Sequence, residues 1–452
     1  MQNNIVTMAQ PDHEDSSQPT FTLFPRRNPG LTSNKAFPTR RSFPFVALSA
    51  LIGLFLLVWI YFFSIFHKPH HSGTWRHHRH SSALKIQHII HSPSFRRTVF
   101  TTPAAGFPEY RDLTLLLTIT NDTTSWGSLT VTSDAVFTFE DFISRIRTQE
   151  VPVESLHLGL LTSDLQAYNS YVTTLSRLTP VEHIPWAKAE IIYLGKLPGP
   201  NGRMQDSHVD VGRESRHTLD LTSQTERRRY LARLKNFLSS HMLTPEVEHV
   251  VWLDADVYGL PTGLFKRFHE LGRIPVGYNI DGMVKAGLRE KDGIMVPGEN
   301  NSNSLQERGV PGAAPPIGLI TLRCQSFDHP DYDRNAWSGF GKRPPSWLLN
   351  NILRGTEYPE MGGWAKAVSQ LTSGTEDNDL VKLDSVGGTA LYIKADLIRE
   401  GLVFPVYSVI GTEWGKDGRD GIETEGLCYV AERLGWGCYA LGGTWRTLHA
   451  DV

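Results

Sequence analysis

A long apolar run, Phe43 to Phe66, contains no charged residue and constrains this chain more than any other feature of its sequence. A helix of that length, at about 1.5 Å per residue, spans a hydrocarbon core of roughly 30 Å. Trp59 and Tyr61 lie toward its far end, where aromatic side chains often meet the membrane interface. A buried core helix is rarely this long without a charge, and a signal peptide has a shorter run nearer the N-terminus and a cleavage site. We therefore expect residues 43–66 to form a transmembrane signal anchor.

The segments on either side of this run are polar and differ in composition. Residues 1–42 are rich in Pro, Ser, Thr and Asn and show no sustained period, which indicates a disordered tail. The adjacent pair Arg40 and Arg41 favours a cytoplasmic N-terminus and a luminal body. Residues 67–109 include a His-rich run, His67 to His91, that could bind metal adventitiously or form a hydrated stem. We expect the stem.

Charge and cysteine content exclude several classes of protein. The net charge is −2 and no basic patch is interleaved with aromatic residues, so a nucleic-acid-binding protein is not indicated. The sequence has no Ser-nucleophile elbow, H-E-x-x-H, Walker lysine loop or G-x-G-x-x-G after a strand. There are 3 cysteines and no C-x-x-C, so the zinc and thioredoxin-like patterns are absent. Cys428 and Cys438 could pair in an oxidising lumen.

From about residue 110, short apolar runs alternate with amphipathic segments. Leu113 to Thr120, Ser155 to Thr162 and His249 to Leu253 have the pattern of buried strands. Phe137 to Arg147 and Glu226 to Met242 have helical spacing. Strands that alternate with helices predict an α/β domain over residues 110–452, with a mostly parallel sheet flanked by helices. In such sheets ligands bind beyond the carboxyl ends of the strands.

The strongest local signal for chemistry is VVWLDADV, Val250 to Val257. Asp254 and Asp256 follow a buried strand and are separated by one residue, so both carboxylates can face the same side. Adjacent carboxylates repel unless a cation lies between them, and the pair suits a hard divalent ion such as Mn²⁺ or Mg²⁺. Such an ion would neutralise a diphosphate and act as a Lewis acid on a departing nucleotide. The alternative is a solvated loop after a core strand.

Three further groups are weaker candidates. In LDSVGGTA the paired glycines would let the backbone approach a ligand beside Asp384, or the segment is simply a turn before the strand Ala390 to Lys394. Glu423 and Glu425 are flanked by glycines, and one of them could be a catalytic base, or both could favour the start of a helix. His449 would matter only if the C-terminal segment returns to the metal, where a neutral imidazole is an acceptable ligand.

In their order along the chain, these motifs resemble the fungal mannosyltransferase family that builds the mannan backbone of Golgi N-glycans, the family of the mannan polymerase subunits. The resemblance covers roughly three quarters of the chain, from LLLTIT to the end. It is carried by five segments: ERRRYLARLKNFL, VVWLDADV, YDRNAW, LDSVGGTALYIKAD and IETEGLCYVAERLGW. The N-terminal anchor is similar to the family's type II topology in the Golgi membrane.

The resemblance implies a GT-A-like nucleotide-sugar-binding fold, with GDP-mannose as donor, Mn²⁺ as metal and retaining transfer of an α-mannosyl residue. By the same resemblance, Asp254 and Asp256 match the motif that binds the metal and the diphosphate. Lys235 and Asn236 match residues that line the nucleotide pocket. His449 falls where the family has a histidine that can complete the metal shell.

The acceptor side follows from the same resemblance. Asp384 matches a carboxylate near the sugar or acceptor, and Glu423 and Glu425 match an acidic pair near the acceptor. The chain departs from the family at Ser385, where Gly is usual, and in a segment before IETEG that looks inserted. The expected partners are a mannose-containing glycan acceptor, the membrane and paralogous polymerase subunits. The competing hypotheses are a non-catalytic subunit of such a complex and a metal-dependent hydrolase or phosphodiesterase.

Overall fold

A computed structural model describes the chain over these residues: 84–102, 112–129, 134–178, 184–198, 204–206, 221–276, 279–285, 288–291, 294–297, 314–327, 329–333, 335–338, 366–409 and 421–450. Contacts divide the chain into two units, Met1–His78 and Arg79–Val452, and only the second contains described residues. Within them, no helix combines the length and the apolar character that crossing a membrane requires. The predicted anchor at 43–66 lies outside the described residues.

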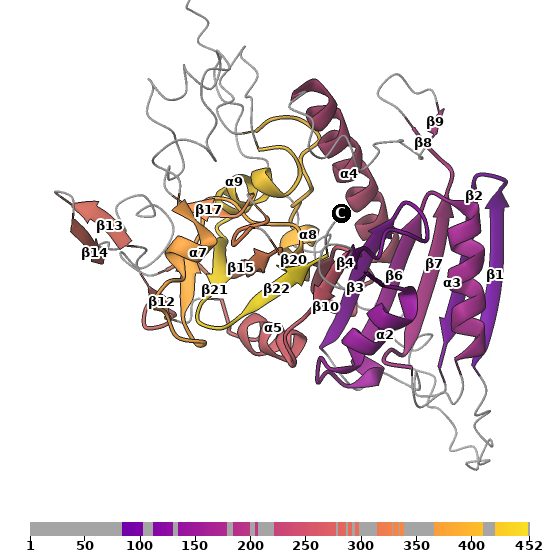
Figure 1. Cartoon of the computed structure of the whole chain (residues 1–452), viewed down its shortest axis with the longest axis horizontal. Helices are drawn as coiled ribbons and strands as arrows, with labels where there is room; N and C mark the ends of the chain where they lie inside the picture. The colour runs from indigo at the N-terminus through magenta and orange to yellow at the C-terminus, as the bar shows by residue number, and fades with distance from the viewer. Residues whose placement is uncertain are drawn as a thin grey trace, which may run out of the picture. The chain divides into compact units, whose positions relative to one another are not determined.

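The centre of the molecule is a sheet of 11 strands in the order β1-β2-β7-β6-β3-β10-β20-β15-β21-β19-β12 (Figure 1). These strands are β1 (Lys85–Ser92), β2 (Phe95–Thr101), β3 (Leu113–Thr120), β6 (Leu156–Thr162), β7 (Lys188–Leu194), β10 (Val247–Leu253), β12 (Val284–Lys285), β15 (Ile317–Thr321), β19 (Leu380–Lys382), β20 (Ala390–Lys394) and β21 (Gly437–Leu441). The strands that the sequence predicts around residues 113–120, 155–162, 249–253 and 390–394 are confirmed as β3, β6, β10 and β20.

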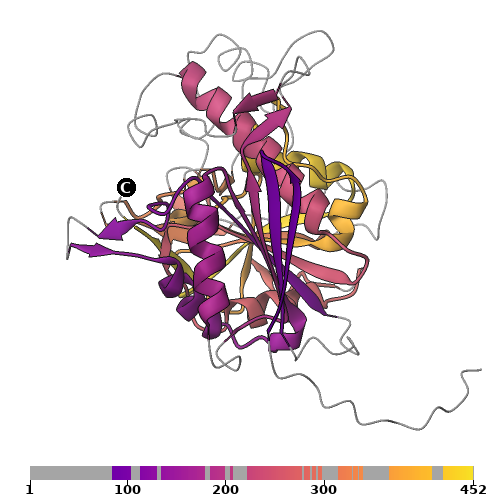
Figure 2. The ribbon, with the colours of Figure 1, turned by 90° about the vertical axis from the view of Figure 1, so that its right-hand side faces the viewer.

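Helices cover the sheet. They are α2 (Phe139–Arg147), α3 (Leu165–Arg177), α4 (Leu221–Met242), α5 (Leu264–Gly272), α7 (Val368–Leu371), α8 (Ala395–Arg399) and α9 (Leu427–Arg433), with 3₁₀ turns η1 (Val153–Ser155) and η5 (Glu423–Gly426). The helices that the sequence predicts around residues 137–147 and 226–242 are confirmed as α2 and α4. The N-terminus of α2 is fixed by a capping box, in which Thr138 and Asp141 each accept a backbone N–H of the other. Figure 2 shows the strands between α3 on one side and α4 on the other.

The remaining strands form short ribbons outside the main sheet. These are β4 (Ser128–Leu129), β5 (Ala135–Val136), β8 (Lys196–Pro198), β9 (Met204–Asp206), β11 (Val257–Gly259), β13 (Leu288–Lys291), β14 (Ile294–Pro297), β16 (Arg323–Gln325), β17 (Trp337–Ser338), β18 (Lys366–Ala367) and β22 (Arg446–His449). The most important for the site is a three-stranded sheet in the order β11-β22-β16. It places β22 directly beside the end of β10, because β11 starts three residues after Asp254.

Alternate side chains of the central strands enter two separate cores. On β10, Val251 and Leu253 pack with α2, α3 and α5, whereas Val250 and Trp252 pack with α4, α8 and α9. Burial on both faces explains why most side chains of β3 and β10 are apolar. It also fixes the register, since a shift by one residue would exchange the two sets of side chains.

The expectation of a mostly parallel sheet is met only in part, because the sheet is mixed. Strands β7, β6, β3 and β10 are parallel neighbours. Strand β20 lies between β10 and β15 and is antiparallel to both. Its direction follows from its starting point: the chain enters β20 at the carboxyl end of β10, where Asp254 N donates to Thr389 O over 2.9 Å.

The folded part of the chain reaches further toward the N-terminus than the sequence predicts. Strands β1 and β2 form an antiparallel hairpin, and β2 pairs with β7 over seven residues, Phe95 to Thr101. Residues 85–101 therefore belong to the sheet, although they lie within the range 67–109 that the sequence assigns to a stem. Most side chains of β1 face solvent, so the sequence lacks the pattern of buried residues by which the other strands were predicted.

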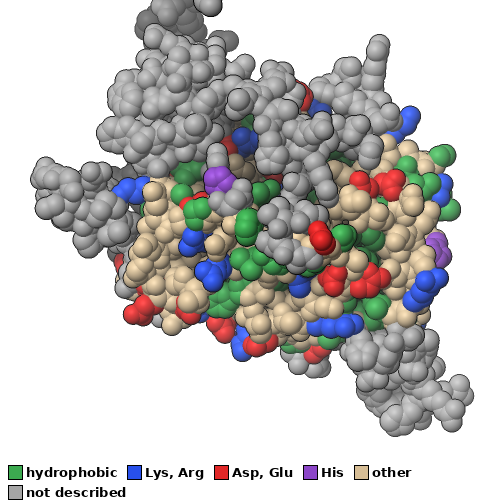
Figure 3. All heavy atoms as spheres, in the orientation of Figure 1, with side chains coloured by type: hydrophobic (Ala, Val, Ile, Leu, Met, Phe, Trp, Pro, Cys, Tyr) green, Lys and Arg blue, Asp and Glu red, His purple; other side chains and the backbone are tan. Residues whose placement is uncertain are grey.

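A disulfide and the surface complete the description. Cys428 on α9 is bonded to Cys438 on β21, and Cys324 is a buried free cysteine. The pairing that the sequence left open is therefore present. On the described part of the face in Figure 3, basic and acidic side chains are interspersed, which agrees with a net charge of −2.

Candidate active site

Strand β10 delivers both predicted carboxylates to the edge of the sheet. Asp254 and Asp256 follow its last residue, Leu253, and Asp256 is 8% exposed. The backbone around them is fixed on two sides, because Asp254 N donates to Thr389 O and Ala450 N donates to Asp256 O, each over 2.9 Å. The carboxylates therefore lie on a rigid support between β20 and the segment after β22.

Strand β22 returns to these carboxylates, and this return is the condition on which a role for His449 at the metal depends. His449 is the residue of β22 that lies opposite Val257 of β11. Its Nε2 lies 3.0 Å from Asp256 Oδ1, its Nδ1 lies 2.7 Å from Ala450 O, and the ring is buried. The ring of Tyr332 stacks on it with 3.8 Å between centroids. The structure thus brings together two of the three residues expected to bind the metal, His449 and Asp256, and Asp254 lies two positions before Asp256.

Gly127 permits this close approach and was not singled out from the sequence. A Cβ at Gly127 would lie 2.4 Å from Ala450 Cβ and 3.2 Å from Asp256 Cβ. Its φ of +80° also favours glycine. A single glycine in a short loop carries no pattern that sequence reasoning could have used.

Lys235 and Glu423 form a buried ion pair beside the carboxylates. Lys235 Nζ lies 2.6 Å from Glu423 Oε1, and the two residues are 5% and 7% exposed. The ammonium group also lies 5.6 Å from the ring centroid of Trp252 and 5.4 Å from that of Phe404. Burial opposes the charged form of Lys235, but the carboxylates of Glu423 and Asp254 outweigh it and raise its pKa.

The backbone at Glu423 is strained, which is unusual for a residue with a side chain. Its φ is +62°, in the left-handed region that favours glycine. Glu423 N donates to Pro405 O over 2.9 Å, which holds the residue in this conformation. Strain of this kind costs of order 1–3 kcal/mol and persists where the surroundings over-determine the geometry, most often at functional sites.

Asp333 is a member of the cluster that the sequence did not identify as a site residue. Its Oδ2 accepts hydrogen bonds from Gly388 N over 2.6 Å, from Thr389 N over 3.1 Å and from Thr389 Oγ1 over 2.8 Å. A Cβ at Gly387 would lie 2.3 Å from this same oxygen, so the glycine is required for the approach. The glycine motif therefore receives an acidic side chain of the protein itself. Only the position of YDRNAW in the ordered motif series pointed toward Asp333.

The cluster around the D-x-D motif contains four carboxylates and two basic groups, so negative charge exceeds positive charge and the pKa values reflect this excess. Its members are Asp254, Asp256, Asp333, Glu423, Lys235 and His449. Burial raises the pKa of Asp254 to about 6, against the opposing charge of Lys235. The carboxylates of Asp256, Glu423 and Asp333 act in the same direction as burial. Burial opposes the charged form of His449, but Asp256 outweighs it and raises the pKa of the imidazole. A divalent cation would relieve this repulsion, and two carboxylates with an imidazole suit Mn²⁺.

The other predicted residues have partners of their own. Asp384 Oδ2 accepts from Ser338 Oγ over 3.2 Å. Glu425 is 1% exposed and its Oε2 lies 2.5 Å from the guanidinium of Arg228 on α4. Asn236 donates to Phe404 O and accepts from Phe404 N, both over 2.8 Å. The roles expected for these three side chains toward acceptor and nucleotide stay predictions.

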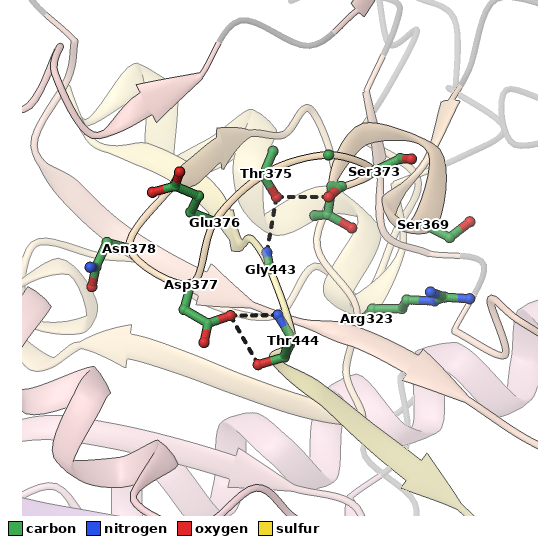
Figure 4. Close-up of a pocket in the computed structure, with 11 residues that line it drawn as sticks. Arg323, Ser369, Ser373, Thr375, Glu376, Asp377, Asn378, Gly443 and Thr444 are labelled. Carbon is green, nitrogen blue, oxygen red and sulfur yellow. Dashed lines mark hydrogen bonds between the residues drawn. The ribbon is translucent and has the colours of Figure 1, made fainter.

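A pocket lies apart from these residues. It has a volume of about 690 Å³ and polar walls (Figure 4). Its lining residues are Arg323, Ser369, Thr372, Ser373, Gly374, Thr375, Glu376, Asp377, Asn378, Gly443 and Thr444. Asp377 Oδ1 accepts from Thr444 N over 2.6 Å and Thr444 Oγ1 over 2.9 Å, so part of the wall is bonded internally. None of the predicted site residues lines this pocket.

Comparisons with known proteins agree with the order of the motifs. A family model described as Anp1 matches residues 114–280 and 320–408, which is more than half of the chain. These ranges include the residues from Lys235 to Asp256 and from Asp333 to Asp384, whereas Glu423, Glu425 and His449 lie beyond them.

Curated relatives match at modest identity. A mannan polymerase complex subunit, mnn9 of Schizosaccharomyces pombe, is 26% identical over 239 residues, which cover 53% of this chain and 57% of that protein. MNN9 of Candida albicans, another mannan polymerase complex subunit, is 26% identical over 48% of either chain. The ANP1 subunit of mannan polymerase II from Saccharomyces cerevisiae is 25% identical over 41% of this chain and 30% of its own length. The chain thus spans about half the length of the relatives it matches, or less.

One solved structure is a mannosyltransferase from Pyrobaculum calidifontis in complex with GDP-Man and Mn²⁺. It is 12% identical and has a TM-score of 0.33, with 76% of this chain and 58% of that chain covered. A likeness this weak supports neither fold nor function here.

Proposed function

The chain belongs to the Anp1 family, and from this premise we propose that it is a mannosyltransferase. It would transfer mannose from GDP-mannose to a mannose-containing glycan with retention of the α configuration, in a GT-A-like site that requires Mn²⁺. The proposal also includes a Golgi location, a type II anchor at residues 43–66 and paralogous subunits as partners. The relatives named above as mannan polymerase subunits support this direction.

The observation that carries the proposal is the contact between His449 and Asp256. A histidine at the far end of the sequence lies 3.0 Å from a carboxylate of the D-x-D motif, in a site where Asp254 has a raised pKa. Repulsion among buried carboxylates is costly unless a cation compensates for it. Asp254, Asp256 and His449 would hold the Mn²⁺, whose chemistry is Lewis-acid stabilisation of the departing diphosphate.

The remaining residues of the cluster would bind and orient the donor. His449 Nδ1 lies 2.7 Å from the carbonyl oxygen of Ala450, so the ring would present Nε2, which lies 3.0 Å from Asp256 Oδ1, to the metal. Lys235 is held by Glu423 within electrostatic reach of Asp254, which suits it to face the phosphates. Glu423 is also the predicted acceptor-side carboxylate whose charge reaches Asp254, so it is our first choice among Asp384, Glu423 and Glu425.

The test is calorimetric titration of GDP-mannose into the purified full chain, with and without Mn²⁺. We expect binding that requires Mn²⁺ and that Asp256→Asn abolishes. Glu270→Gln is the matched control, because Glu270 is an exposed carboxylate on α5 that pairs with Arg267. Mannosyl transfer to an added mannoside would then establish the reaction, whereas donor turnover without an acceptor would indicate a hydrolase.

A non-catalytic role is the second candidate, favoured by the names of the relatives, which are subunits of complexes. It would be supported if the folded wild-type chain bound no donor in the presence of Mn²⁺. Co-purification with paralogous subunits would then be the next measurement.

A further inference from the structure

A second group of metal-ligand side chains lies at the opposite end of β10. Asp112 immediately precedes β3, and Glu248 and His249 are the second and third residues of β10. One ligand atom from each of these residues lies within 4.8 Å of the other two. Strands β3 and β10 are parallel neighbours (Figure 1). The three residues therefore lie at the amino ends of these strands, whereas Asp254 and Asp256 follow the carboxyl end of β10.

His249 has a buried ring nitrogen without a hydrogen-bond partner in the part of the chain that the structure describes. The residue is 0% exposed, and among the described residues its Nε2 has no hydrogen-bond partner. The nearby charged atom is Asp112 Oδ1, at 3.9 Å, which is too far for a hydrogen bond. Leaving a buried polar atom unpaired is costly, so a buried nitrogen directed toward carboxylates points to a missing partner.

The other atoms of the group are already held in the way that metal ligands are held. His249 Nδ1 lies 2.9 Å from the hydroxyl of Tyr392, which fixes the ring and leaves Nε2 toward Asp112. Asp112 Oδ2 lies 2.5 Å from the guanidinium of Arg273, and its Oδ1 lies toward Nε2. Metal-binding histidines and carboxylates almost always have such a partner on the atom that does not bind the metal.

We propose that Asp112, Glu248 and His249 form a second divalent-cation site, with Zn²⁺ as the ion that fits the donor set. One imidazole nitrogen and two carboxylate oxygens leave a fourth position for water, as in zinc sites with three protein ligands. The ion would join the start of β3 to β10 and, through Asp112, to Arg273 at the end of α5. Asp254 follows His249 by five positions along an extended strand, or roughly 17 Å, so the two sites bind their ions independently.

Zinc binding to the full chain tests the proposal, in an Asp256→Asn background that silences the donor site. The measurement is competition for Zn²⁺ against a chromophoric chelator, together with the unfolding midpoint with and without Zn²⁺. The histidines of residues 67–91 are present in every variant, so their background binding cancels in the comparison.

We expect Asp112→Asn and Glu248→Gln each to weaken the specific Zn²⁺ site by about tenfold or more and to remove the Zn²⁺-dependent rise in unfolding midpoint. Both side chains are partly exposed, so these variants are expected to fold, and Glu270→Gln serves as the control. Zinc affinity unchanged in both variants would overturn the proposal. GDP-mannose binding by Asp112→Asn with a native Asp256 tests the independence of the two sites: it should stay normal, and its loss would contradict a separate second site.

Discussion

Lys235 Nζ lies 2.6 Å from Glu423 Oε1, and the residues are separated by 188 positions in the sequence. Neither charge has free access to solvent, so each depends on the other. Removing one partner of a buried pair is expected to cost about 3–5 kcal/mol, because the remaining charge is left without compensation.

The first prediction concerns this pair. Lys235→Met should destabilise the chain strongly, whereas Glu423→Gln should cost less, because Asp254 still stabilises the ammonium group. The double variant should lose clearly less than the sum of the two single losses. Urea unfolding of the four proteins gives the cycle, and additivity within about 0.5 kcal/mol would show that the pair is not coupled.

A second prediction separates two roles for Asn236. Its amide makes two hydrogen bonds to the backbone of Phe404, so Asn236→Ala should lower the free energy of unfolding by about 2 kcal/mol. The Kd for GDP-mannose should change little in the folded fraction. A tenfold weaker Kd with unchanged stability would instead support the nucleotide-pocket role that the family resemblance implies.

The third prediction concerns the disulfide. Cys428 and Cys438 are 10 positions apart, and closing a loop of this size stabilises a protein by about 3 kcal/mol in the chain-entropy model. Replacing both by alanine should therefore lower the unfolding midpoint. Cys324→Ala is the control for the loss of a buried sulfur, and equal losses in both proteins would contradict a role for the cross-link.

A fourth prediction follows from a histidine kept neutral by the fold. Burial, assisted by Lys188, lowers the pKa of His157 to about 4, from 6.5 in the unfolded chain. Between these values the unfolded state binds the additional proton, so the stability that His157 contributes is full above pH 6.5 and falls as the pH drops toward 4.

The measurement is the difference in unfolding free energy between wild type and His157→Gln. This difference should change by about 1.4 kcal/mol per pH unit in that window, with the wild type losing the advantage at low pH. Working in a chelator keeps metal binding out of the comparison. A difference that does not vary with pH would show that His157 titrates normally in the folded protein.

The sequence predicts those parts of the fold that have a local cause. Strand β3 was predicted with its observed bounds, Leu113–Thr120, because its residues are buried on both faces. The edge strand β1 was missed because its side chains are mostly exposed and carry no burial pattern. The direction of β20 was missed as well, since its antiparallel pairing depends on where the chain re-enters the sheet.

Residues of the candidate site could likewise be predicted only where the sequence signal is local. Asp254 and Asp256 could be identified because two carboxylates follow a buried strand directly. Asp333 could not, because its importance lies in hydrogen bonds to Gly388 and Thr389 more than fifty positions away. The ion pair between Glu425 and Arg228 could not be predicted either, since no local sequence pattern indicates a contact between α4 and η5.

The pairing of β11 with β22 has a consequence for the biosynthesis of the protein. Val257 and His449 are partners in that ladder, so the carboxylates of Asp254 and Asp256 leave the ribosome long before the histidine that closes over them. Contacts of such long range form late and expose intermediates to aggregation. A nascent chain that stops short of β22 would therefore hold an acidic cluster without its histidine, and we expect such a chain to be bound by chaperones and not to reach the native fold.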